Sequence, residues 1–254
     1  MSYLVPLASG STGNCTLLEL GERRLLIDMG ISYKQLRLCL SRLGLGAGDL
    51  DAVLVTHAHS DHIKGLETFL KHETVPVFMT RGTADRARLS GVNLFGRGRA
   101  FSPAPGVEVR SFATSHDCPG SVGFVVRAEG RQIGYATDLG CIPGAILSQL
   151  AGSDFQVLEF NHDVDMLREG PYPYPLQQRI LSDQGHLCNE DAAQAAAWLA
   201  DRGTRRFLLA HLSQQNNTPA AALAAAQSAL AGMDVELHVA PVGMGPVIRL
   251  DEAF

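Results

Sequence analysis

The hydrophobic and polar positions of the chain follow a similar pattern in its two halves. Residues 17–27 read as two strands joined by a short turn, and they run into Asp28. Residues 123–135 repeat this hairpin pattern and run into Asp138. Each hairpin is followed by a helical segment and then by an apolar strand that ends in histidine. The repetition predicts two similar β-β-α-β units, with two mixed sheets face to face, helices outside, and a site at the edge between the sheets.

Helix-start and helix-stop signals place the helices between these strands. Ser32 is followed three residues later by Gln35, a capping-box pattern, and the helix that begins there is expected to end near Gly44. The remaining expected elements are a strand from Asp51, a strand from Asp154, a helix from Asn189 to 199, a strand at 206–210, an alanine-rich helix capped by Thr218 and Pro219 that ends near Gly232, and strands at 235–239 and 247–250.

Composition and charge predict the number of domains and the cellular location of the protein. The 254 residues are 46% hydrophobic and no linker divides them, so we expect one domain over residues 1–254. Five cysteines without a C-x-x-C pair indicate reduced thiols. We find no signal peptide and no apolar run of about 18 residues, so we expect a cytoplasmic protein that does not enter a membrane. The net charge of −5 does not indicate a general nucleic-acid binder, although bound divalent ions would make a cleft locally positive.

The most informative polar segment, THAHSDH at residues 56–62, directly follows an apolar run. Residues two apart on an extended strand project to the same side, so His57 and His59 can bind one metal ion. Once the chain turns, Asp61 and His62 can reach a second ion beside it. Imidazole and carboxylate ligands suit Zn²⁺, and with more oxygen ligands Mn²⁺ or Fe²⁺. The alternative is a histidine-rich solvated loop, which would not need matching ligands elsewhere in the chain.

Further candidate ligands stand at the ends of three other apolar segments, namely His116, Asp138 and His211. Loops just past strand ends are where a rigid sheet can hold polar ligands. Together with Asp28 and residues 56–62, these positions resemble, in order, the five motifs of the metallo-β-lactamase-fold hydrolases, and they span nearly the whole chain. The resemblance implies an α/β fold, a four-layer αββα sandwich of two pseudo-symmetric halves, here without a large inserted domain.

The resemblance also implies a role for each ligand. Two divalent ions, Zn²⁺ or Mn²⁺ and alternatively Fe²⁺, would share one bridging carboxylate, and a further carboxylate would steady the histidine loop. The presence of His59 where redox members carry glutamate favours hydrolysis. The implied ligands are His57, His59 and His116 for the first ion, Asp61, His62 and His211 for the second, and Asp138 for both, with Asp28 as the steadying carboxylate.

The interval between Asp138 and His211 narrows the resemblance. Glu159 ends a predicted strand and His186 lies on the loop before the next helix, similar to the Glu/His pair of tRNA-maturing members, in which the histidine protonates the leaving oxygen. Further characteristic strings lie at residues 8–14, 159–163, 185–187 and 211–217. On these strings the chain resembles the YycJ/WalJ subgroup, described as bacterial metal-dependent DNA exonucleases that act 5′ to 3′. Cys188 departs from this pattern, in which we expect serine.

The resulting hypothesis is two-metal phosphodiester hydrolysis. Asp61 would orient the attacking water, and His186, held by Glu159, would donate a proton to the departing oxygen. The expected partner is a nucleic acid, with DNA favoured over RNA, and the oligomeric state stays open. A small-molecule hydrolase acting on a cyclic phosphodiester or thioester is the alternative, and a non-catalytic module is disfavoured because every ligand position is filled. Candidate substrate contacts, which could equally be a solvated surface, are Asn14, Asn161, His162, Arg168 and Arg179, with Lys34, Lys64, Tyr172 and Tyr174 nearby.

Overall fold

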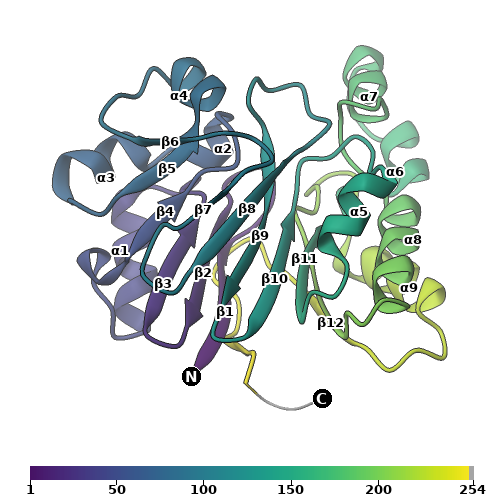
Figure 1. The fold of residues 1–254 in the computed structure, drawn as a ribbon. Coiled ribbons are helices and arrows are strands. Elements are labelled where there is room, and N and C mark those ends of the chain that lie inside the picture. Colours follow the sequence, from purple (N-terminus) through teal and green to yellow (C-terminus); the bar gives the residue numbers. More distant parts are fainter. Residues whose placement is uncertain (252–254) are drawn as a thin grey trace.

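The computed structural model describes residues 1–251, which form four layers (Figure 1). Two seven-stranded sheets lie face to face, and helices cover the outer face of each. The sandwich predicted from the sequence is therefore confirmed. Within the described residues no large domain is inserted between Asp138 and His211, and none of the helices is long and apolar enough to cross a membrane.

The first six strands of the chain form the first sheet, and the last strand of the described residues adds to one edge of it. The seven strands between them form the second sheet. The first sheet contains β1 (Ser2–Ala8), β2 (Cys15–Leu20), β3 (Arg23–Ile27), β4 (Ala52–Leu54), β5 (Val77–Thr80), β6 (Asn93–Phe95) and β14 (Ile248–Arg249). The second contains β7 (Ala100–Phe101), β8 (Glu108–Ala113), β9 (Val122–Ala128), β10 (Arg131–Ala136), β11 (Phe155–Glu159), β12 (Arg206–Ala210) and β13 (Glu236–Val239). Their orders are β14-β1-β2-β3-β4-β5-β6 and β13-β12-β11-β10-β9-β8-β7.

The two sheets share one strand arrangement, which confirms the predicted duplication. β1, β2 and β3 are antiparallel and are followed by the parallel strands β4, β5 and β6. β8, β9 and β10 are likewise antiparallel and are followed by the parallel strands β11, β12 and β13. Asp28 follows β3 and Asp138 follows β10, with left-handed φ angles of 60° and 59°. This conformation is uncommon outside glycine but more accessible to aspartate than to most residues, so the duplication extends to the backbone at both carboxylates.

Nine helices within the described residues and one 3₁₀ turn surround the sheets. They are α1 (Tyr33–Arg42), α2 (Ser60–Ile63), α3 (Leu66–His72), α4 (Arg81–Ala87), α5 (Gly144–Leu150), α6 (Val164–Glu169), α7 (Tyr174–Ile180), α8 (Asn189–Ala200), α9 (Pro219–Ala229) and the turn Ala47–Asp49. Leu18 and Phe124 belong to the apolar core between the sheets. α1 and α3 pack on the first sheet, and α5, α8 and α9 pack on the second, so both sheets are buried on two faces.

The helix caps follow the sequence signals with one refinement. Ser32 accepts a hydrogen bond from N of Gln35 at 3.2 Å and α1 follows it, as predicted. Thr218 caps α9 in the same way. α8 begins at Asn189 as expected, but Cys188 provides its cap, because the side chain of Asn189 is buried and donates to Asn217 at 3.0 Å. The five cysteines are all free thiols, also as predicted.

Candidate metal centre and active site

The predicted ligands all follow the carboxyl ends of strands in the two sheets. The parallel strands β3 and β5 flank β4 and fix the point at which the histidine-rich segment leaves the first sheet. The chain then turns into α2, which leaves His57 and His62 fully buried. His59 and Asp61 stay partly exposed, with 29% and 23% of their side chains accessible. Two ligands of this segment are therefore enclosed and two can meet a molecule from solvent.

The first cluster consists of His57, His59 and His116, whose ligand atoms lie within 4.8 Å of one another. Nδ1 of His59 is 3.0 Å from Nε2 of His57 and 3.2 Å from Nε2 of His116. Nδ1 of His116 donates to the carbonyl oxygen of Gly185 at 3.1 Å. Because a carbonyl oxygen only accepts, Nδ1 of His116 carries a hydrogen, and the lone pair of its Nε2 faces the cluster.

The second cluster consists of Asp61, His62 and His211. Oδ2 of Asp61 lies 3.4 Å from Nε2 of His62 and 3.7 Å from Nε2 of His211. Asp138 lies between the clusters, with Oδ2 3.4 Å from Nε2 of His62 and Oδ1 3.7 Å from Nε2 of His116. The structure thus brings the residues together in the two sets that the resemblance implied, and their binding of ions stays a prediction.

Asp28 accepts hydrogen bonds from residues of the histidine-rich segment 56–62. Its Oδ2 accepts a hydrogen bond from Nδ1 of His62 at 2.8 Å, and its Oδ1 accepts one from N of Thr56 at 2.8 Å. The hydroxyl of Thr56 also donates to this carboxylate. Asp28 is fully buried, and its bond fixes the tautomer of His62 so that Nε2 faces Asp138. This is the position predicted for a carboxylate that steadies a ligand.

Glu159, the last residue of β11, contacts two histidines with one oxygen. Its Oε1 lies 2.9 Å from Nδ1 of His186 and 2.8 Å from Nδ1 of His211, while Oε2 accepts from N of Leu139 and N of Leu187 at 3.0 and 3.1 Å. Burial raises the pKa of Glu159, but the charges and hydrogen bonds of the two histidines outweigh burial and lower it to about 2. The pairing with His186 was predicted, whereas the bond to His211 was not.

The electrostatics of the centre suit bound cations. Burial raises the pKa of Asp138, but neighbouring histidines, His211 foremost, outweigh it and hold the pKa well below its usual range. Burial lowers the pKa of His211, but Asp138, Asp61 and Glu159 outweigh it and raise the pKa to about 10. Oδ2 of Asp138 and Nε2 of His211 are buried without a hydrogen-bond partner in the described part of the chain. Asp138 is therefore ionised, and unpartnered imidazole and carboxylate atoms that lie close together fit divalent ions.

Asn14 supports Asp61 instead of facing the cleft, which corrects its predicted position as a substrate contact. Asn14 is 4% exposed, its Nδ2 donates to Oδ2 of Asp61 at 3.2 Å, and its backbone N donates to the carbonyl of Asp61 at 2.7 Å. N of Gly30 donates to the carbonyl of Asn14 at 2.7 Å. A Cβ atom at Gly30 would lie 1.6 Å from the carbonyl oxygen of Asp61, so only glycine fits there.

A cleft of about 340 Å³ opens beside the two clusters. Of the remaining predicted substrate contacts, Asn161 and Arg179 line it. Arg168 and His162 do not: Arg168 lies on the exposed side of α6, and His162 is 1% exposed, with burial lowering its pKa to about 4. The lining residues are Ser11, His59, Ser60, Asp61, Asp138, Asn161, Tyr172, Leu176, Arg179, Ile180, His186, His211 and Ser213.

The apolar wall of this cleft could not be predicted from the sequence. Leu176 and Ile180 belong to α7, a short helix between β11 and α8 that carries no strong periodic signal. The proline before Tyr174 and the spacing of these two side chains, four residues apart, were the available signals. The serines at positions 11, 60 and 213 also line the cleft and had no distinguishing pattern.

Comparison with known proteins identifies the family. The family model described as β-lactamase superfamily domain matches residues 23–212, which include every predicted ligand from Asp28 to His211. The chain belongs to the β-lactamase superfamily. Two superfamily relatives match over 220 residues each. Exodeoxyribonuclease YycJ of Bacillus anthracis is 37% identical, covering 83% of this chain and 82% of its own, and exodeoxyribonuclease WalJ of Streptococcus pneumoniae is 33% identical, covering 83% and 81%.

A solved structure agrees with the superfamily fold. The metallo-β-lactamase fold protein YhfI from Bacillus subtilis superposes with a TM-score of 0.75 and covers 98% of this chain and 100% of its own. At 18% identity, this likeness concerns the fold alone.

Proposed function

We propose that this chain is a divalent-metal-dependent nuclease that hydrolyses phosphodiester bonds, prefers DNA to RNA and digests it from the 5′ end. The observation that carries the proposal is the convergence of two ligand clusters on Asp138, beside a cleft that also holds the Glu159–His186 pair. The relatives named exodeoxyribonucleases support nucleic acid, and DNA in particular, as the substrate. The proposal includes a single domain over residues 1–254 and a cytoplasmic location, which the five free thiols support.

The proposed ion ligands divide between the two clusters. Zn²⁺ or Mn²⁺, and alternatively Fe²⁺, suit such a set of imidazoles and carboxylates. When bound, divalent ions activate water and neutralise charge on a phosphodiester. The residues that would hold them are His57, His59 and His116 on one side, Asp61, His62 and His211 on the other, and Asp138 between.

His186 is the proposed proton donor. It lines the cleft with 18% of its side chain exposed, and its Nδ1 donates a hydrogen bond to Glu159. A protonated His186 can therefore donate from Nε2 to the departing oxygen while Glu159 compensates its charge. Asp61, also on the cleft, is held by Asn14 in a position to orient the attacking water. Burial raises the pKa of Asp61, but the neighbouring imidazoles of His211 and His62 outweigh burial and lower it, so Asp61 is ionised.

One alternative role for His186 arises from the same geometry. His186, Glu159, Asp138 and His211 also have potential ligand atoms within 4.8 Å of one another. If His186 is a metal ligand, substituting it would also release the ion. If it is a proton donor, substituting it would leave the metal content unchanged. The metal content of His186→Ala therefore separates the two roles.

The test is a time course with Mn²⁺-loaded protein on single-stranded DNA and RNA, each labelled at the 5′ or the 3′ end. The proposal expects stepwise loss from the 5′ end, faster on DNA, and a strongly reduced rate in His186→Ala. Intact polynucleotides under conditions in which a cyclic phosphodiester or a thioester is hydrolysed would contradict it and indicate a small-molecule hydrolase.

A further inference from the structure

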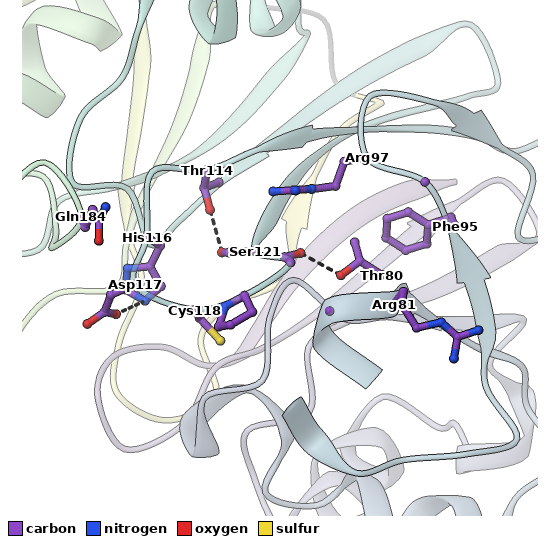
Figure 2. Close-up of a pocket in the computed structure, with 14 residues that line it drawn as sticks. Thr80, Arg81, Phe95, Arg97, Thr114, His116, Asp117, Cys118, Ser121 and Gln184 are labelled. Atoms are coloured by element: carbon purple, nitrogen blue, oxygen red, sulfur yellow. Dashed lines mark hydrogen bonds and ion pairs between the residues drawn. The ribbon is translucent and has the colours of Figure 1, made fainter. Parts of the chain in front are cut away.

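A second and larger hollow lies on the other side of His116 from the cleft. Its volume is about 700 Å³, and it is formed by the ends of β5, β6 and β8 with the turns beside them (Figure 2). His116 and Asp117 lie at one end of it, and Arg81 and Arg97 lie on its walls. We call this hollow the arginine groove. Beside these four residues, Phe95, Thr114 and Ser121 line it.

Two contacts connect the arginine groove to the cleft. Nε2 of His116, in the groove lining, lies 3.2 Å from Nδ1 of His59, which lines the cleft. Asp117 in the groove lining accepts a hydrogen bond from Nε of Arg179 in the cleft lining at 2.5 Å. The two hollows are therefore adjacent, and these four residues form the rim between them.

The segment that forms one wall of the groove is strongly basic, although the chain has a net charge of −5. Residues 81–99 contain five arginines, and their one acidic residue is Asp85. All five arginines are exposed. Such a local concentration of charge attracts a polyanion independently of the charge of the whole chain. The five are Arg81, Arg86, Arg88, Arg97 and Arg99.

The acidic residues near this wall, Asp85 and Asp117, do not neutralise its positive charge. Asp85 lies 3.8 Å from Arg81, and both side chains are mostly exposed, so their ion pair is weak. Asp117, the acidic residue of the groove lining, is paired with Arg179 and so repels an approaching phosphate less. Arg97 has no hydrogen bond or ion pair among the described residues, and Figure 2 shows its side chain extending toward Thr114 and Ser121. Arg97 is therefore available to an anion inside the groove, and Arg81, whose exposed side chain extends outward in Figure 2, adds positive charge at its edge.

We propose that the arginine groove binds the sugar-phosphate backbone of the nucleic acid strand that continues beyond the cleaved bond. This inference rests on the proposed nuclease function and deepens it. The one aromatic residue of the lining, Phe95, is only 9% exposed, so the groove offers charge and not a base-stacking surface. Contacts of this kind position a strand without reading its sequence. Arg81 and Arg97 supply these phosphate contacts.

The test measures binding of a fluorescently labelled single-stranded oligonucleotide as a function of salt, with metal-loaded protein in the His186→Ala background to slow cleavage. Each phosphate contact to a single strand contributes about −0.7 to the slope of log K against log salt. Arg81→Ala with Arg97→Ala should weaken binding and make the slope less negative by about 1.4. Arg81→Lys with Arg97→Lys keeps the charges and should keep most of the slope.

The matched control is Arg37→Ala with Arg42→Ala, which removes the same charge from exposed positions on α1 outside the groove lining and should leave the slope unchanged. If wild-type protein degrades DNA but the groove variant keeps the wild-type slope, the groove inference is wrong and the nuclease proposal stands. If wild-type protein neither binds nor degrades polynucleotides, the proposed function is wrong, and the groove inference that rests on it is wrong as well.

Discussion

Oε1 of Glu159 accepts a hydrogen bond from Nδ1 of His186 at 2.9 Å. The same oxygen accepts one from Nδ1 of His211 at 2.8 Å. A single buried carboxylate atom therefore orients both the proposed proton donor and a proposed metal ligand. Substituting His186 should affect turnover alone, whereas substituting Glu159 should affect turnover and metal binding together.

His186→Ala should lower the turnover of DNA by about 10² to 10⁴, the usual contribution of a general acid, while the protein keeps its full metal content. Rates on DNA and elemental analysis of the same preparation measure the two properties. His72→Ala, an exposed histidine on α3 outside the cleft, is the control and should match the wild type. Loss of an ion in His186→Ala would show that His186 is a ligand.

Glu159→Gln should impair both the donor and the ligand. A carboxylate accepts from two backbone N–H groups and two imidazoles here, whereas a carboxamide has one accepting oxygen and must turn its NH₂ toward one of the pairs. We expect an ion affinity about 10- to 100-fold weaker, as for other partners of metal-ligating histidines, together with slower turnover. Chelator competition measures the affinity. Unchanged affinity would mean that the bond to His211 does not support metal binding.

Asp138→Asn should release at least one of the two ions. Asparagine tolerates the left-handed φ of 59° at this position, so the substitution removes the shared charge and leaves the backbone conformation accessible. Asp138→Ala should add about 1–2 kcal/mol of backbone strain to the same loss. Metal analysis after gel filtration, with a thermal melt of both variants, separates the two effects. A variant that retains both ions and full activity contradicts the bridging role.

Gly30→Ala should destabilise the protein and disturb Asp61, because the added Cβ would overlap the carbonyl of Asp61 at 1.6 Å. Overpacking of this kind costs about 1–3 kcal/mol, and at the upper end of that range Tm falls by about 6–12 °C. Gly144→Ala is the matched control, because its Cβ meets nothing within 4 Å at the start of α5. Equal melting temperatures for the two variants would contradict the close packing of Gly30.

The positions of the ligands could be predicted because they depend on local pattern. β4 is a short apolar run and β12 ends in one, and polar residues just beyond their carboxyl ends must lie at one edge of a sheet. The repeated hairpins likewise predict equivalent positions for Asp28 and Asp138, and the structure gives both the same backbone conformation.

Contacts between distant segments could not be predicted in this way. Asn14 contacts Asp61 across 47 residues, and Arg179 pairs with Asp117 across 62 residues, so neither partner is visible in local sequence. The arginine groove was also missed. Residues 81–99 are rich in glycine and arginine but show no regular spacing of these residues. A binding role for their charge becomes visible only in the structure, where part of this segment lines the same groove as His116.

The central claim is that phosphodiester cleavage depends on two divalent ions held by these ligands. The most direct measurement is a titration of chelator-treated protein with Mn²⁺, in which bound ions and cleavage of end-labelled DNA are followed in the same samples. We predict no cleavage by the metal-free protein and a rise to full activity as binding reaches two ions per chain. Cleavage that persists without bound ions, or that is complete at one ion per chain, would contradict the account.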